Sequence, residues 1–207
     1  MVVLDAKLPL DEMLTISDDD RDMVMGTTSR LSVGWSLSRE DMLHLALMSS
    51  ENRAAAALSR YYPGGRPAFI AAMNKKAADL GMGNTHFVNP NGLTNENVST
   101  AFDLVKLVQA AYQYPLIREY STDPGSDVKI GKYTLAFGNS NRLVGRPDWD
   151  IQIQKTGFTN EAGRCLVMRV NLDGRSVIMI FLDGNGKLTR FADARRVRMQ
   201  LALAQKK

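Results

Sequence analysis

Residues 164–182 read RCLVMRVNLDGRSVIMIFL, and this stretch decides the fold class. Two nearly continuous apolar runs, 164–171 and 175–182, stand on either side of Asp173-Gly174. Asp-Gly is favoured in the tight turns that join antiparallel strands, because both positions of such a turn need a positive φ. The stretch therefore predicts a β-hairpin.

The segments around this hairpin extend the same pattern. Upstream, isoleucines alternate with glutamines in residues 151–154, and apolar side chains alternate across residues 128–137. A period of two is typical of strands. We place the change from helical to alternating periodicity after Pro115 and expect an antiparallel sheet of at least three strands. Residues 187–207 have apolar side chains at helical spacing and predict a final helix that covers the sheet.

The preceding part of the chain, residues 1–112, carries helical patterns. Ser38 to Asp41 has the form of a capping box at the start of a helix. An interruption at residues 49–52 separates that helix from an alanine-rich one. Two further helices are expected at residues 67–80 and 100–112, the first with a proline near its start and Gly81 after its end.

The irregular parts of this half are also visible in the sequence. Residues 84–93 are rich in Asn, Pro and Gly and predict a shaped loop. Residues 18–22 form an acidic turn. Residues 1–6 begin in the middle of an apolar pattern with no capping residue before them, which indicates the tail of a helix that is cut open.

Helices, then an antiparallel sheet, then a covering helix indicate a mixed α and β (α+β) domain. The 207 residues, 44% hydrophobic and 23% charged, are enough for one domain with a sizeable core, so residues 1–207 are expected to be a single domain. No apolar run approaches the roughly 18 residues of a membrane span, and residues 1–30 lack a signal-peptide pattern.

Composition argues against two classes of function. Cys165, His44 and His86 would all be consumed by one zinc site, so we expect no metal and interpret Cys165 as a buried, inert thiol. The net charge of +4 is concentrated in a basic end, which can indicate nucleic-acid binding. Those arginines alternate with apolar residues at helical spacing, so a solvated helix face explains them better, and no nucleic-acid partner is expected.

Two short elements can carry chemistry. Lys155-Thr156-Gly157, at the end of the strand predicted at 151–154, combines an ammonium and a hydroxyl that can bind a carboxylate with a glycine that lets a peptide lie close. A strand end with an exposed lysine is the plainer interpretation. Ser50-Glu51-Asn52 places a serine and an asparagine where two helices meet, although a serine there is more often a helix N-cap.

The two elements gain weight from their order. Ser-x-x-Lys, a Ser-x-Asn type element and Lys-Thr-Gly, in that order, are the three motifs of penicillin-recognising serine enzymes. Ser126-Asp127-Val128-Lys129 matches the first motif literally, but it runs into a predicted strand. A working Ser-x-x-Lys needs one helical turn to bring both side chains to one face. We interpret that match as chance.

With these motifs the chain resembles the low-molecular-mass penicillin-binding proteins, in particular the D-alanyl-D-alanine carboxypeptidase and endopeptidase family of the penicillin-binding protein 7 kind. The likeness covers nearly the whole chain. Besides the two motifs it includes residues 1–6, 85–93, 137–141, 155–159 and 162–163. It implies a β-lactamase/transpeptidase-like fold, with an antiparallel sheet flanked by helices and a helical subdomain.

The resemblance also implies roles for matching positions. Ser50 would relay a proton to the leaving amine, and Asn52 would contact the substrate amide. Lys155 and Thr156 would form the carboxylate and proton-network side, and Gly157 would lie beside the peptide. The Phe158 amide would be half of an oxyanion hole. Arg190 would help to hold the terminal carboxylate, whereas His86 is expected to make a structural hydrogen bond.

The implied protein is a periplasmic serine peptidase without a cofactor, whose partners are peptidoglycan peptides and β-lactam antibiotics. The family's Ser-x-x-Lys should lie just before residues 1–6, so we expect the nucleophile and its base upstream of Met1 and an inactive 207-residue fragment. Endopeptidase action on crosslinks is favoured, and carboxypeptidase action is the nearest alternative. A non-catalytic wall-binding domain also stays open.

Overall fold

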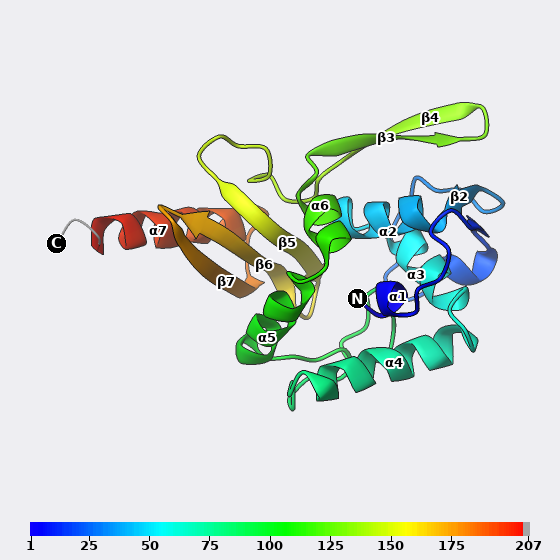
Figure 1. The fold of residues 1–207 in the computed structure, drawn as a ribbon, viewed down its shortest axis with the longest axis horizontal. Helices are drawn as coiled ribbons and strands as arrows, with labels where there is room; N and C mark the ends of the chain where they lie inside the picture. Colours follow the sequence, from blue (N-terminus) through cyan, green and yellow to red (C-terminus); the bar gives the residue numbers. More distant parts are fainter. Residues whose placement is uncertain (205–207) are drawn as a thin grey trace.

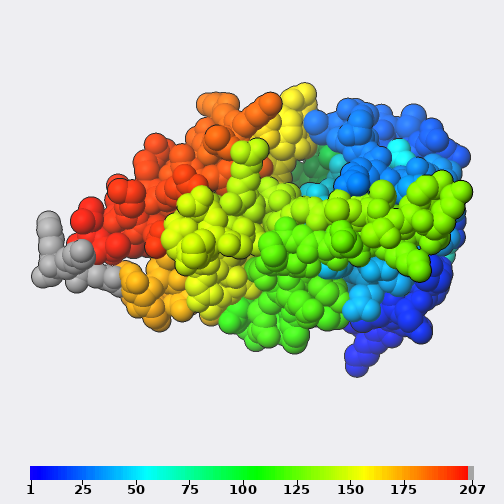
Figure 2. Space-filling view, turned by 90° about the horizontal axis from the view of Figure 1, so that it is seen from above, coloured from blue at the N-terminus to red at the C-terminus, as the bar shows by residue number. Residues whose placement is uncertain are grey.

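The structure, a computed structural model, describes residues 1–204. The expected final helix reached to Lys207, so its last three residues lie outside the described part. The molecule is elongated, with a helical region at the N-terminal end and a sheet with its covering helix at the other (Figures 1 and 2). We call these the helical region (residues 1–100) and the sheet region (residues 143–204).

The sheet region confirms the predicted antiparallel sheet. Its strands are β5 (Asp150–Thr159), β6 (Gly163–Leu172) and β7 (Arg175–Gly184), in the order β5-β6-β7. Asp173 and Gly174 have φ values of 51° and 81°, as the predicted hairpin turn requires. β5 is longer than expected and continues through Thr159, because it pairs with β6 along its whole length. The Lys-Thr-Gly element therefore lies within a strand and not at its end.

The covering helix α7 (Thr189–Ala204) packs on this sheet through Phe191 and Ala194, beside the buried side chains of Leu166 and Met168. Arg195, Arg196 and Arg198 lie on the solvent side, where Arg196 and Arg198 pair with aspartates, whereas Arg190 at the start of the helix is buried. The interpretation of the basic end as a solvated helix face is thus confirmed for these three arginines and is wrong for Arg190.

The helical region has the expected helices and the predicted break between the second and third. Ser38 caps one of them by accepting from the Asp41 amide. The helices are α1 (Val2–Asp5), α2 (Arg39–Met48), α3 (Asn52–Arg60) and α4 (Gly65–Asp79), followed by α5 (Ala101–Ala111). Two elements were not predicted, the short strands β1 (Met13–Thr15) and β2 (Ser36–Ser38), which pair with each other. The acidic turn is the 3-10 helix η1 (Asp18–Asp20).

The prediction that strands begin after Pro115 is wrong, because Pro115–Thr122 forms helix α6. The proline takes the first helical position, where its missing N–H costs nothing. Ile117 and Tyr120, three residues apart, bury one face of the helix. The strands that follow, β3 (Gly125–Ile130) and β4 (Tyr133–Gly138), pair only with each other among the described strands and project as a separate hairpin (Figure 1).

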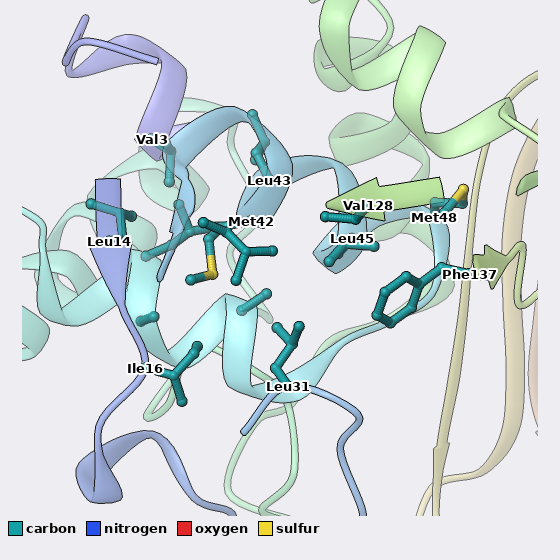
Figure 3. Close-up of a cluster of buried hydrophobic side chains, with 14 of the residues drawn as sticks. Val3, Leu14, Ile16, Leu31, Met42, Leu43, Leu45, Met48, Val128 and Phe137 are labelled. Atoms are coloured by element: carbon teal, nitrogen blue, oxygen red, sulfur yellow. The ribbon is translucent and has the colours of Figure 1, made fainter. Parts of the chain in front are cut away.

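The core of the helical region anchors this hairpin (Figure 3). Leu14, Leu45 and Met48 have no exposed surface, and Val128 and Phe137 of the hairpin pack against the same cluster. Each fully buried aliphatic side chain of this kind stabilises the fold by about 1.5–3 kcal/mol. The end of α2 is thus fixed in position by the core behind it.

A third apolar cluster ties the two regions together. Val108 of α5 and Ile117 of α6 pack with Ile153 of β5. Beside it, the Gln154 side chain donates to the Ser121 carbonyl at 2.6 Å. These contacts set β5 against the end of α2, which is where the two motifs meet. Among the described residues, none of the helices combines the length and apolar character of a bilayer-spanning segment.

Candidate active site

A cavity of about 710 Å³ lies between the helical region and the sheet region, and we call it the cleft. The structure brings all seven predicted site residues to its walls: Ser50, Asn52, Lys155, Thr156, Gly157, Phe158 and Arg190. The two motifs stand 105 residues apart in the sequence, yet Lys155 Nζ donates to Ser50 Oγ at 2.5 Å. The sequence-predicted residues therefore form one site.

Ser50 lies in the break between α2 and α3 in an unusual backbone conformation. Its φ of 59° is in the left-handed region, which costs a non-glycine residue about 1–3 kcal/mol. The plainer interpretation of Ser50 as a helix cap is wrong, because the N-cap of α3 is Glu51, whose carboxylate accepts from the Arg53 amide at 3.1 Å. The Ser50 hydroxyl is thus free of a capping role and contacts Lys155.

Lys155 is held from both regions. Its ammonium donates to Ser50 Oγ and, at 2.9 Å, to the Thr156 carbonyl. Burial and, to a smaller extent, the nearby charge of Arg190 lower the pKa of Lys155 to about 8. The side chain is therefore still mainly protonated at neutral pH, but it can lose its proton more readily than an exposed lysine.

Thr156 contacts a residue that the sequence did not single out. Its hydroxyl donates to Ser140 Oγ at 2.7 Å. Ser140 follows β4, and its own amide donates to the carbonyl of Met48 at the end of α2, at 3.0 Å. The only sequence signal for it was its place in the family-like segment 137–141. That segment, a connector between the hairpin and β5, thus reaches the site.

Asn52 and Arg190 make further contacts in the walls of the cleft. Asn52 Nδ2 donates to Thr27 Oγ1 at 3.0 Å, and Thr27 also lines the cleft although the sequence gave no sign of it. Arg190 is 8% exposed, and its Nη1 donates to the carbonyls of Gly157 and Cys165 at 2.8 and 3.2 Å. Burial lowers the pKa of Arg190. Arg190 therefore braces the backbone of β5 and β6.

The strand that carries the Lys-Thr-Gly element has an accessible edge. β5 pairs with β6 along one side, and no other strand of the described sheet pairs with its second side. Gly157 and Phe158 are exposed there, with Phe158 at 44%. An open edge of this kind can bind an extended peptide through backbone hydrogen bonds.

Other residues considered in the sequence lie away from this chemistry. Ser126 and Lys129 are on strand β3, so the Ser-x-x-Lys match there has no helical turn, as expected. His86 pairs with Val98 through backbone hydrogen bonds. Cys165 is half-buried and not fully buried as expected, and its thiol donates to the Ala162 carbonyl at 3.3 Å. Residues 1–204 contain no cluster of His, Cys, Asp and Glu that could hold a metal.

A second, smaller recess adjoins the cleft. Its volume is about 350 Å³, and Leu93 lines both spaces. Polar side chains dominate its walls: Thr94, Asn95, Asn160 and Glu161, with Val24 and Met25. The recess extends the cleft past the end of β5.

Comparisons with known proteins match this architecture. The profile of the D-alanyl-D-alanine carboxypeptidase family matches residues 1–186. The chain is 54% identical to the D-alanyl-D-alanine endopeptidase of Pseudomonas aeruginosa over 207 residues, covering 99% of this chain and 67% of the relative. It is also 54% identical to the D-alanyl-D-alanine endopeptidase of Escherichia coli over 200 residues, covering 96% and 64%. The chain thus spans about two thirds of the length of these relatives.

Solved structures agree with the fold. The crystal structure of the Streptomyces K15 DD-transpeptidase matches with a TM-score of 0.87 at 29% identity, over 98% of this chain and 83% of that one. A D-alanyl-D-alanine carboxypeptidase from Mycobacterium tuberculosis matches with a TM-score of 0.78 at 28% identity, over 90% and 70%. The predicted β-lactamase/transpeptidase-like fold is confirmed.

Proposed function

We propose a function from one premise: this chain belongs to the D-alanyl-D-alanine carboxypeptidase family, whose profile matches residues 1–186. The site best supports a serine-type D-alanyl-D-alanine endopeptidase that acts on the peptide crosslinks of peptidoglycan. The observation that carries the proposal is the contact of Lys155 with Ser50 across the cleft. Proton transfer needs its partners at hydrogen-bond distance, and this contact supplies that distance.

In this mechanism a serine attacks the D-alanyl carbonyl, the leaving amine departs, and water hydrolyses the acyl-enzyme. Ser50 relays a proton to the leaving amine, while Lys155 orients the Ser50 hydroxyl and supplies positive charge. Asn52 contacts the substrate amide. Gly157 gives the peptide access to the open edge of β5, and the Phe158 amide forms half of the oxyanion hole.

The nucleophile and its base are proposed to come from a Ser-x-x-Lys helix that precedes residue 1. Two observations support this part of the proposal. The curated relatives are longer than this chain. Apolar side chains line the cleft beside α1 and offer a surface against which such a helix can pack: Leu43, Leu47, Phe69 and Met73. Residues 1–207 then form one domain together with that segment.

Endopeptidase action is favoured over carboxypeptidase action for two reasons. Both relatives at 54% identity are named D-alanyl-D-alanine endopeptidases. The recess that shares Leu93 with the cleft also gives a crosslinked peptide room past the cleaved bond. Because peptidoglycan is the substrate, we place the protein in the periplasm, and we expect β-lactam antibiotics to acylate the same serine.

Labelling with a fluorescent penicillin tests the proposal. The full-length protein should form a covalent adduct, and mass spectrometry should place it on a serine upstream of residue 1. Residues 1–207 expressed alone should remain unlabelled, because no acyl-enzyme can form without the nucleophile. An adduct on Ser50 or Ser126 would show that the nucleophile is misplaced. A full-length protein that binds peptidoglycan but is never labelled would instead support a non-catalytic wall-binding domain.

A further inference from the structure

A loop that follows the acidic turn η1 lines both the cleft and the recess beside it. Thr27 lies in the wall of the cleft, whereas Val24 and Met25 lie in the wall of the recess. We call residues 22–27 the Asp22 loop. The mechanism proposed above gives this loop no role, although its Thr27 contacts Asn52, the residue that is proposed to bind the substrate amide.

The Asp22 carboxylate holds this loop in one shape. Its Oδ1 accepts from the amides of Val24 and Met25 at 2.8 and 3.0 Å, and its Oδ2 accepts from the amide of Thr27 at 2.8 Å. A hydrogen bond from the Thr27 hydroxyl adds a fourth donor. Burial raises the pKa of Asp22, but these hydrogen bonds outweigh it and hold the pKa below its ordinary value. Asp22 is therefore an anion at neutral pH.

The charge of Asp22 sets the direction of the hydrogen bonds that lead to Asn52. An ionised carboxylate only accepts, so the Thr27 hydroxyl donates its proton to Asp22 and turns its lone pairs to Asn52. Asn52 Nδ2 donates to Thr27 Oγ1 at 3.0 Å. The reverse orientation of the Asn52 amide would set Oδ1 against those lone pairs, two acceptors together. Asp22 thus fixes which end of the Asn52 amide faces Thr27.

The Asn52 side chain keeps free groups for a ligand. Besides the bond to Thr27 it makes no side-chain hydrogen bond within residues 1–204, so Oδ1 and one N–H stay available. Its backbone is fixed as the first residue of α3. The neighbouring Arg53 donates from Nη1 to the carbonyl of the buried Leu31 at 2.6 Å, which ties the segment after the loop to the same helix.

We propose that Thr27 is a positioning residue that orients Asn52 toward the substrate amide, and that Asp22 acts through Thr27. A peptide amide has one donor and one acceptor, and a fixed Asn52 offers it one acceptor and one donor. The inference rests on the proposed function and deepens it, because it extends the recognition of the peptide from Ser50-Glu51-Asn52 to a loop outside both motifs.

Two β-lactams test this role in the full-length protein. Benzylpenicillin carries an acylamino group with an amide, whereas aminopenicillanic acid is the same nucleus with a free amine and lacks that amide. Thr27→Val removes the hydroxyl at nearly constant size. Acylation by benzylpenicillin relative to aminopenicillanic acid should therefore fall about fivefold or more, the scale of one hydrogen bond. Competition with a fluorescent penicillin measures both rates.

The control variants keep or move the hydroxyl. Thr27→Ser retains it and should keep the wild-type ratio of the two rates. Thr28→Val makes the same change at the exposed neighbouring residue and should also keep the ratio. A fall of the ratio in either variant to the value of Thr27→Val would overturn the inference, because the effect would then not depend on the Thr27 hydroxyl.

Asp22→Asn tests the other end of the chain of hydrogen bonds. An asparagine side chain has one acceptor oxygen in place of two, so it cannot hold the loop amides and the Thr27 hydroxyl together. The ratio should fall as in Thr27→Val. Asp19→Asn removes an exposed carboxylate from the acidic turn and should leave the ratio unchanged. An unchanged ratio in Asp22→Asn would contradict the role of Asp22.

The remaining outcomes separate a structural role from failure of the proposed function. If Thr27→Val slows acylation by both β-lactams equally, or slows neither, Thr27 does not orient Asn52 and the inference is overturned, whatever the melting temperature. If the wild type forms a penicillin adduct on a serine upstream of residue 1, the proposed function survives each of these results. A wild type that neither β-lactam acylates removes the proposed function and this inference together.

Discussion

The helical region and the sheet region hold their halves of the site in different ways. Lys155 lies in the middle of β5, where regular pairing with Val167 of β6 fixes its direction. Ser50 lies in an irregular break between two helices, at a φ of 59°, and no regular ladder supports it. The sheet positions the Lys155 side chain by regular strand pairing. The helical region positions the Ser50 side chain through a strained backbone conformation. Strain kept at such a position points to function and not to stability.

The largest expected effect comes from removing the strained residue's hydroxyl. Ser50→Gly relieves the positive φ, which glycine adopts freely, and also removes the proposed proton relay. Peptidase activity of the full-length protein should fall at least about 100-fold, the lower range for general acid–base catalysis. The free energy of unfolding should rise by roughly 1 kcal/mol.

Ser50→Ala is the matched control for this change, because it removes the same hydroxyl but keeps the strain. It should lose the same activity without becoming more stable. A Ser50→Gly protein that is destabilised yet fully active would contradict the comparison, since Ser50 would then serve the fold. Melting temperature and peptidase rate, measured on both variants, separate the two roles.

The sheet half of the comparison predicts a smaller loss of activity. Lys155→Ala removes a charge from a partly dry cleft without disturbing the β5–β6 pairing. Penicillin acylation should slow by about tenfold or more, a barrier rise of at least about 1.4 kcal/mol. Stopped-flow acylation measures this rate. If the rate is unchanged, Lys155 does not belong to the catalytic machinery.

The acylation rate should also depend on pH through Lys155. Burial lowers its pKa from 10.5 to about 8, so the ammonium that donates to Ser50 is present below pH 8 and lost above it. A rate that depends on the charged form therefore falls as the pH rises through about 8. Lys155→Arg keeps a positive charge throughout this range, so its profile should lack that fall. A wild-type rate that rises through pH 8, with the rise lost in Lys155→Arg, would mean that neutral Lys155 acts as a base.

The two regions also differ in how far the sequence predicted them. The β6–β7 hairpin follows from Asp173-Gly174, and the start of α2 follows from the cap at Ser38, because both signals are local. The two motifs could be assigned to one site only through their resemblance to a family. Their contact joins residues 105 positions apart, and no local pattern specifies such a distance.

Three features could not be predicted, each for a physical reason. Helix α6 is short, and a short apolar pattern does not distinguish a helix from a strand, so strands were expected after Pro115 where a helix begins. The φ of Ser50 and the role of Glu51 as cap depend on where α2 stops. The bond from Thr156 to Ser140 depends on the connector, which hydrogen bonds to the carbonyls of Met48 in α2 and Ser121 in α6 hold in place. All three are set by tertiary packing.

The smallest expected effect lies at the far end of the β3–β4 hairpin, which belongs to neither half of the site. Tyr133 stacks on Trp35 with ring centroids 5.7 Å apart, and Tyr133 is 49% exposed. An aromatic pair of this kind contributes about 0.5–1.5 kcal/mol, so Tyr133→Ala should lower the free energy of unfolding by about 1 kcal/mol. Leu45→Ala, in the fully buried core, should cost about 2–5 kcal/mol by comparison. Urea denaturation of the full-length protein measures both.

Penicillin acylation should be unchanged in Tyr133→Ala, because the stack lies at the opposite end of the hairpin from the connector that reaches Thr156. Slower acylation in that variant would mean that the hairpin as a whole positions Ser140, and the connector could then no longer be treated as fixed by α2 and α6 alone.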